Sequence, residues 1–235
     1  MLAPLGLLAA FAAHRHSEVI LLLLPVVLIV SRIASEREAR HTQELELRTA
    51  YQGTSYLLGD MIEADDEYTG THSRDVVNLV LEVSRRLRLD ADDLTVAEFT
   101  ALLHDVGKVK LPAAIVNKPG PLDLDERALV ETHTLIGEQM LEPIGGLLGR
   151  VGRIVRSCHE RWDGTGYPDG LAGEEIPLVA RIVAACDTWS AMTTDRPYRR
   201  ALSREEAAAE LLRARATQLD PDVVDVLADV LGLQR

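Results

Sequence analysis

Apolar residues follow two patterns along this chain. Two unbroken apolar runs, residues 2–13 and 19–30, open it. From Tyr68 onward, apolar residues return every three or four positions, for example at Val76 and Val80, which predicts amphipathic helices. No segment of this part alternates apolar and polar residues between hairpin signals as paired strands do. We therefore expect an all-α fold, a helical bundle, in residues 67–235.

The two apolar runs predict a transmembrane segment over residues 1–33. Neither run alone reaches the roughly 18 residues of a full span. The second nearly does if it extends to Ala34 with Arg32 reaching back to the surface. A helical hairpin, a single span and a buried core helix are the alternatives. Arg32, Arg37 and Arg40 follow the run, which favours a location at the cell membrane with the rest of the chain in the cytoplasm.

Residues 35–62 are polar and lack proline, which predicts a helical linker over residues 34–66. One seam of this segment has a residue at alternating steps of four and three: Leu47, Tyr51, Thr54, Leu58 and Met61. Such a seam pairs with a second copy of the helix or packs on the chain's own domain, and the pattern favours neither.

Capping residues and turn residues predict the helix boundaries. Thr95 and Glu98 have the spacing of a capping box. Asp123 or Asp125 can cap the next helix, and Ser203 a later one. Glycine and proline concentrate in two stretches that we expect to be loops: residues 111–122 and 161–177.

The charge balance excludes one class of partner. With 25 Lys and Arg against 37 Asp and Glu, the net charge is −12, so bulk binding of nucleic acid is not expected. An anionic substrate would need metal ions or a cluster of arginines. The only cysteines, Cys158 and Cys186, exclude a disulfide framework and are expected to be reduced.

The candidate chemistry lies in histidines and aspartates of the helical part. Metal sites need nitrogen and oxygen ligands that converge from several elements. A carboxylate such as Asp105, next to His104, can bridge two cations, and two cations can generate hydroxide for phosphoryl transfer. The candidate ligands are His72, His104, Asp105, His133, His159 and Asp187.

These residues resemble a known family. His104 and Asp105, followed by Gly107 and Lys108, resemble the signature of the HD phosphohydrolase superfamily. The segment HERWDGTGYPDGLAGEEIPLVARI, which begins at His159, is similar to the signature of the HD-GYP subfamily. The name-giving triplet of that subfamily is present here as Gly166, Tyr167 and Pro168.

The resemblance implies a phosphodiesterase that uses a metal-bridged hydroxide to hydrolyse cyclic di-GMP to pGpG, GMP or both. It also implies a homodimer and two divalent metal ions, iron or manganese. One ion would be bound by His72, His104, Asp105 and Asp187, and the other by Asp105, His133 and His159. Lys108 would lie beside the scissile phosphate. The substrate would be contacted by Gly166, Tyr167, Pro168, Arg196 and Arg199.

This chain departs from the family pattern at two positions. Cys158 stands where the family usually has a histidine, and it is either a thiolate ligand or a small buried residue. Without that ligand, the alternative function is an impaired domain that binds cyclic di-GMP or another protein. Tyr68 stands where three-metal members have a glutamate, so two metals are expected. Glu160 and Asp163 either orient His159 or lie at a solvated loop edge.

Overall fold

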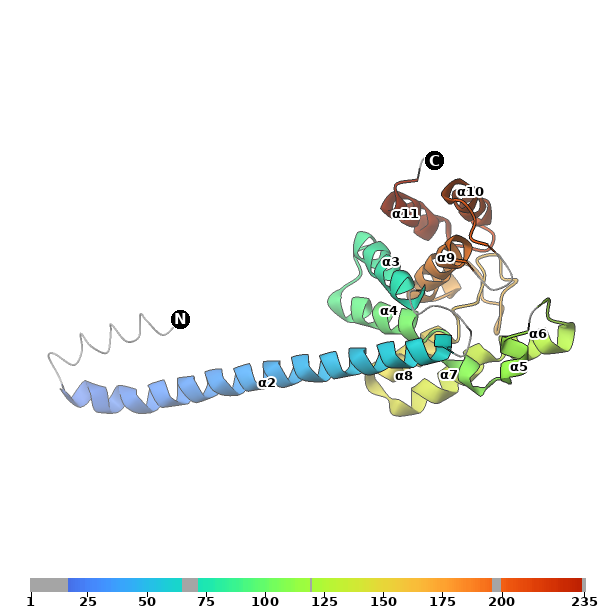
Figure 1. Ribbon diagram of the computed structural model, residues 1–235. Coiled ribbons are helices and arrows are strands. Elements are labelled where there is room, and N and C mark those ends of the chain that lie inside the picture. Colours follow the sequence, from blue (N-terminus) through green and yellow to red (C-terminus); the bar gives the residue numbers. More distant parts are fainter. Residues whose placement is uncertain (1–16, 65–71, 119, 196–199, 234–235) are drawn as a thin grey trace. The chain divides into compact units, whose positions relative to one another are not determined.

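The computed structural model describes residues 17–64, 72–118, 120–195 and 200–233 (Figure 1). All regular elements in these ranges are helical, apart from one isolated bridge between Arg215 and Leu219, so the all-α prediction is confirmed for them. The α-helices are α2 (Ser17–Ala64), α3 (His72–Arg86), α4 (Ala91–Leu103), α5 (Ala113–Val116), α6 (Leu124–Glu131), α7 (His133–Leu141), α8 (Gly146–Val155), α9 (Leu178–Thr193), α10 (Arg204–Ala214) and α11 (Pro221–Leu231). Short 3₁₀ helices are η1 (Val106–Lys110), η2 (Glu142–Ile144) and η3 (Gly173–Glu175).

The chain divides into two compact units, Met1–Gln52 and Gly53–Arg235, and α2 crosses the boundary. Among the described residues, no helix has both the length and the apolar character needed to cross a membrane. The predicted membrane segment, residues 1–33, lies largely outside the residues covered by this statement. Residues 1–16 and the side chains of 17–24 lie outside what the structure describes, as do most side chains of the predicted seam.

Two predicted helix caps are confirmed. The carboxylate of Asp123 accepts a hydrogen bond from the amide of Glu126 at 2.8 Å, and the Glu126 carboxylate accepts one in return at 2.9 Å. Ser203 forms the same reciprocal pair with Glu206 at the start of α10. Each pair joins residues three apart, so local sequence is enough to form it.

The predicted cap at Thr95 is wrong. Helix α4 begins one turn earlier, because the carboxylate of Asp90 accepts a hydrogen bond from the amide of Asp93 at 2.8 Å. Thr95 lies inside the helix, and its hydroxyl donates to the carbonyl oxygen of Ala91 at 3.0 Å. Aspartate is at least as good a cap as threonine, and Asp90 accepts a hydrogen bond from an amide of the first turn, so the helix begins there.

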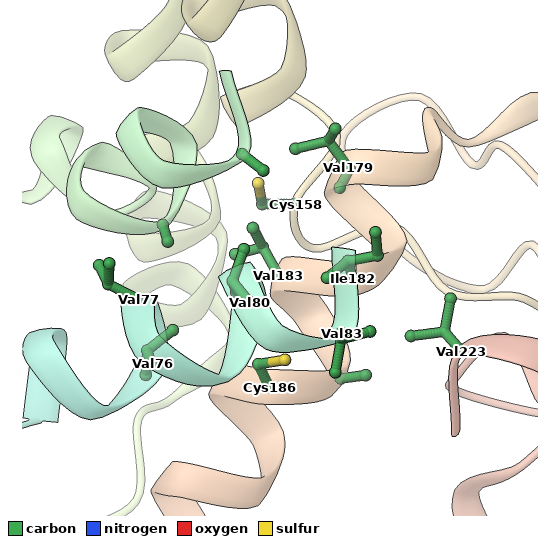
Figure 2. Packing of buried hydrophobic residues seen from close by; sticks show 14 of the residues in the cluster. Val76, Val77, Val80, Val83, Cys158, Val179, Ile182, Val183, Cys186 and Val223 are labelled. Atoms are coloured by element: carbon green, nitrogen blue, oxygen red, sulfur yellow. The ribbon is translucent and has the colours of Figure 1, made fainter. Parts of the chain in front are cut away.

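A core of small and branched side chains holds α3, α4, α9 and α11 together (Figure 2). Helix α9 contributes Ile182 and Val183, both fully buried, and α3 packs Val76 and Val80 against this cluster. Burying each such side chain contributes about 1.5–3 kcal/mol. The core fixes the end of α4, which leads into His104 and Asp105, and it fixes α9, which carries Asp187.

Candidate metal centre

The site begins where α4 ends. After Leu103 the chain turns through His104 and Asp105 into η1. Gly107 in η1 lies against the start of α7, where an added Cβ would be only 1.9 Å from the carbonyl oxygen of His133. Any side chain at this position would push η1 away from α7. This glycine therefore allows Asp105 and His133 to meet.

Asp105, His133 and His159 form a compact cluster, with one ligand atom of each within 4.8 Å of the others. The Oδ1 atom of Asp105 is 3.3 Å from Nε2 of His133 and 4.0 Å from Nε2 of His159. All three atoms are buried and have no hydrogen-bond partner among the described residues. Buried polar atoms without partners are costly, so this cluster fits a bound cation.

The second oxygen of Asp105 faces a different group. Its Oδ2 atom accepts a hydrogen bond from Nζ of Lys108 at 2.7 Å and lies 3.5 Å from Nε2 of His104. That same His104 nitrogen is 4.0 Å from Oδ1 of Asp187, which α9 contributes. The two oxygens of Asp105 thus point to two separate sets of ligand atoms, as a bridging carboxylate requires.

Backbone carbonyls set the tautomer of two histidines. The carbonyl oxygen of Ala101 lies 2.8 Å from Nδ1 of His104, and that of Val130 lies 2.7 Å from Nδ1 of His133. Because a carbonyl only accepts, each Nδ1 carries the hydrogen and each Nε2 offers its lone pair to the cluster. Helix α6 ends at Glu131 and α7 begins at His133, so this ligand lies at a break between two helices.

Charge and burial hold the ligands in the protonation states that bind a cation. Burial opposes ionisation of Asp105, but Lys108 and His104 outweigh it and hold the pKa of this carboxyl well below its usual range. Burial lowers the pKa of His159, which keeps the ring neutral. A carboxylate and a neutral imidazole are the forms that bind divalent metals.

The loop after His159 places an aromatic ring against this ligand. The ring of Tyr167 stacks on the ring of His159, with centroids 5.2 Å apart and an interplanar angle of 16°. An added Cβ at Gly166 would lie 2.4 Å from the amide nitrogen of Arg161 and 2.6 Å from Cα of Glu160. Only glycine lets the loop return this closely. Pro168, joined to Tyr167 by a cis peptide bond, is half-buried beside them.

Cys158 lies in the hydrophobic core instead of the ligand cluster. Only 3% of its surface is exposed, and its thiol donates to the carbonyl oxygen of Ile154 at 3.5 Å. It belongs to the same core cluster as Val179 and Val183 (Figure 2). Burial also raises the pKa of the Cys158 thiol, which disfavours the thiolate that a metal would bind.

Three of the candidate residues cannot be placed. His72 begins α3, but its side chain lies outside the described residues, as do Arg196 and Arg199 entirely. The structure brings together the remaining candidates of the metal site: His104, Asp105, Lys108, His133, His159 and Asp187.

Two residues near the loop gain a role that the sequence did not assign. The sequence left two alternatives for Glu160, a residue that orients His159 or one at a solvated loop edge. In the structure Glu160 is buried and accepts hydrogen bonds from two loop amides. Arg156 pairs with carboxylates of Glu138 and Asp169. Arg156 directly follows α8, which already contains Arg150 and Arg153, so no local pattern distinguishes it.

The chain matches a known protein family over most of its length. The HD domain family matches residues 56–223. The chain is 37% identical over 171 residues to the cyclic di-GMP phosphodiesterase response regulator RpfG of Xanthomonas campestris, which covers 72% of this chain and 45% of that protein. It is 35% identical over 176 residues to the 3'3'-cGAMP-specific phosphodiesterase 3 of Vibrio cholerae, covering 75% and 38%. The chain thus spans less than half the length of these relatives.

A solved structure shares the fold. The crystal structure of a cyclic GMP-AMP-specific phosphodiesterase of Vibrio cholerae, V-cGAP3, superposes with a TM-score of 0.58 and 21% sequence identity. The match covers 76% of this chain and 48% of that one.

Proposed function

Because the family match extends over most of its length, the chain belongs to the HD domain family, and we propose that it is a metal-dependent phosphodiesterase acting on cyclic di-GMP. One observation carries this proposal. Asp105 presents one oxygen to nitrogens of His133 and His159, and its other oxygen lies beside His104 and Lys108. Relatives with 37% and 35% identity are named phosphodiesterases of cyclic dinucleotides.

The residues present fit two divalent cations, for which we propose iron or manganese. Asp105, His133 and His159 would hold one ion. Asp105, His104 and Asp187 would hold the other, together with His72. Bound there, the ions would activate water and neutralise charge on the phosphate.

The chain's own groups have defined tasks in this reaction. Lys108 supplies a positive charge next to Asp105, where a phosphate would lie, and stabilises the charge that develops during cleavage. Tyr167 covers His159 and keeps water from that side of the ring. We propose that Arg196 and Arg199 bind phosphate or guanine through their planar guanidinium groups. The products would be pGpG, GMP or both.

A related cyclic dinucleotide is the second candidate substrate. Several relatives, at 31–35% identity, are named 3'3'-cGAMP-specific phosphodiesterases. Because both molecules have the same phosphodiester ring, the metal cluster would serve either one. Comparing kcat/KM for the two substrates decides between them.

The proposal is tested by hydrolysis of cyclic di-GMP by the full chain with Mn²⁺, or with Fe²⁺ under anaerobic conditions. Asp105→Ala should lower turnover by about 10²-fold or more, because the shared ligand of both ions is lost. Asp93→Ala is the matched control, since it removes an exposed carboxylate that pairs with Arg150. Unchanged turnover in Asp105→Ala would overturn the proposal.

The alternative is a domain that binds cyclic di-GMP without hydrolysing it. The placement of Cys158 in the core favours this alternative, because no ligand replaces the usual histidine there. Binding measured by calorimetry, with no hydrolysis in either metal, would select it.

Attachment to the membrane through residues 1–33, with the domain in the cytoplasm, remains our proposal from the two apolar runs. Fractionation of cells expressing the full chain and a form lacking these residues tests it. A homodimer through residues 34–66 is likewise proposed, and the mass of the particle in solution decides it.

A further inference from the structure

The buried carboxylate of Glu160 binds the loop from inside. Only 4% of this residue is exposed. Its Oε1 atom accepts a hydrogen bond from the amide of Asp169 at 2.7 Å, and its Oε2 atom accepts one from the amide of Leu171 at 3.1 Å. A buried carboxylate needs such donors, and bonds to a charged group are stronger than neutral ones.

Arg156 binds the same loop from outside. Its guanidinium group forms two parallel hydrogen bonds with the carboxylate of Asp169, at 2.7 and 2.8 Å. A third bond, 2.6 Å long, reaches the carboxylate of Glu138. Glu138 lies on α7, the helix that begins with His133. Arg156 therefore connects the loop to the helix that carries a candidate metal ligand.

Both contacts act on the segment that carries Tyr167. Asp169 follows Tyr167 by two residues. On the other side, the amide of Tyr167 donates to the carbonyl oxygen of His159 at 3.3 Å, and Gly166 lies against the backbone of Glu160. The loop is thus held before and after Tyr167, and the ring is held flat against His159.

We propose that Glu160 is a positioning residue for the substrate, with Arg156 as its outer counterpart. The carboxylate of Glu160 holds the Asp169–Leu171 segment, so that Tyr167 remains stacked on His159 beside the metal cluster. Neither residue contacts substrate, and both act through Tyr167. This inference rests on the proposed function, because it assumes that a cyclic dinucleotide binds next to Tyr167.

Glu160→Gln tests the inference, because glutamine keeps the shape and replaces one acceptor oxygen with a donor that faces a backbone amide. Hydrogen exchange at the amides of Asp169 and Leu171 should accelerate about tenfold or more. The KM for cyclic di-GMP should rise about tenfold, while kcat and the Mn²⁺ content stay within about threefold of the wild type. A loss of global stability alone would not produce this split.

Glu175→Gln is the matched control. Glu175 lies in the same loop and is exposed, and its carboxylate accepts a hydrogen bond from the amide of Ala172 at 3.3 Å. Its KM and the exchange of the Asp169 and Leu171 amides should equal those of the wild type. If Glu160→Gln does not fold, Arg156→Gln releases the loop from outside and should produce the same KM shift and faster exchange at Asp169.

Unchanged exchange, or a fall in kcat with KM constant, would overturn the positioning role. A wild-type chain without any hydrolysis would instead refute the proposed function. In that case the exchange measurement, together with the affinity of the unhydrolysed nucleotide, still tests whether Glu160 positions the loop.

Discussion

Gly107 is the point at which backbone packing and the metal cluster depend on each other most directly. In Gly107→Ala, the new Cβ would lie 1.9 Å from the carbonyl oxygen of His133, whereas real Cβ atoms almost never come within 3.0 Å of another heavy atom. The η1 segment and α7 must therefore move apart by about 1.1 Å. Overpacking of this size costs about 3 kcal/mol, which lowers Tm by roughly 6–12 °C in a domain of this size.

The same displacement would separate Asp105 from His133, which are now 3.3 Å apart. A misplacement of about 1 Å at a reacting centre reduces turnover by about 10²-fold. Thermal unfolding followed by circular dichroism, Mn²⁺ titration and hydrolysis of cyclic di-GMP measure the three effects. Gly53→Ala is the control, because its Cβ meets nothing within 4 Å, and Tm should stay equal or rise. A Tm within about 2 °C of the wild type, with unchanged Mn²⁺ affinity, would refute the reasoning.

Three further predictions follow from burial and charge. Burial raises the pKa of Cys158 and Cys186, so a thiol reagent at about pH 8 should modify neither in the native chain and both after denaturation; rapid native labelling would contradict this. Burial lowers the pKa of His104, but the charges of Asp105 and Asp187 more than compensate and leave it raised. Its Nε2 therefore takes up a proton at a higher pH than an ordinary histidine, and the protonated ring cannot bind a metal. Calorimetry should show the affinity for Mn²⁺ decreasing between about pH 7.5 and pH 6, and a constant affinity would argue against His104 as a ligand. Arg181→Met removes the charged partner of Asp220, whose side chain is 2% exposed, and should cost about 3–5 kcal/mol in urea unfolding. Arg127→Met, which breaks an exposed pair with Glu131, should cost less than about 1 kcal/mol, and equal costs would contradict the role of burial.

The helices were predictable wherever short-range contacts decide them. Asp123 with Glu126 and Ser203 with Glu206 form capping boxes between residues three apart, so the pattern and the structure agree. Thr95 and Glu98 have the same spacing, yet Asp90 caps the helix one turn earlier. Asp90 and Thr95 are both suitable caps, and the sequence pattern alone does not show which of them begins the helix. The break between α6 and α7 carries no glycine or proline, and the local pattern gave no sign of it.

The residue types of the site were predictable, but their mutual geometry was not. The motif around His104 and Asp105 identified candidate ligands, since the family resemblance assigns each by its place in the sequence. The distance of 3.3 Å between Asp105 and His133 depends on Gly107, which admits a contact between segments about 30 residues apart. The sequence allowed Cys158 to be either a metal ligand or a core residue. Its packing among valines shows that it is a core residue.

By itself, the sequence determined an all-helical domain, its family and the chemical groups that could bind metals, because periodicity, caps and motifs are local properties. The tertiary structure decided which oxygen of Asp105 faces which histidine, and that Glu160 is buried beneath the loop. These features arise from contacts between distant segments, and they exist only once the core has fixed α4, α7 and α9 around one site.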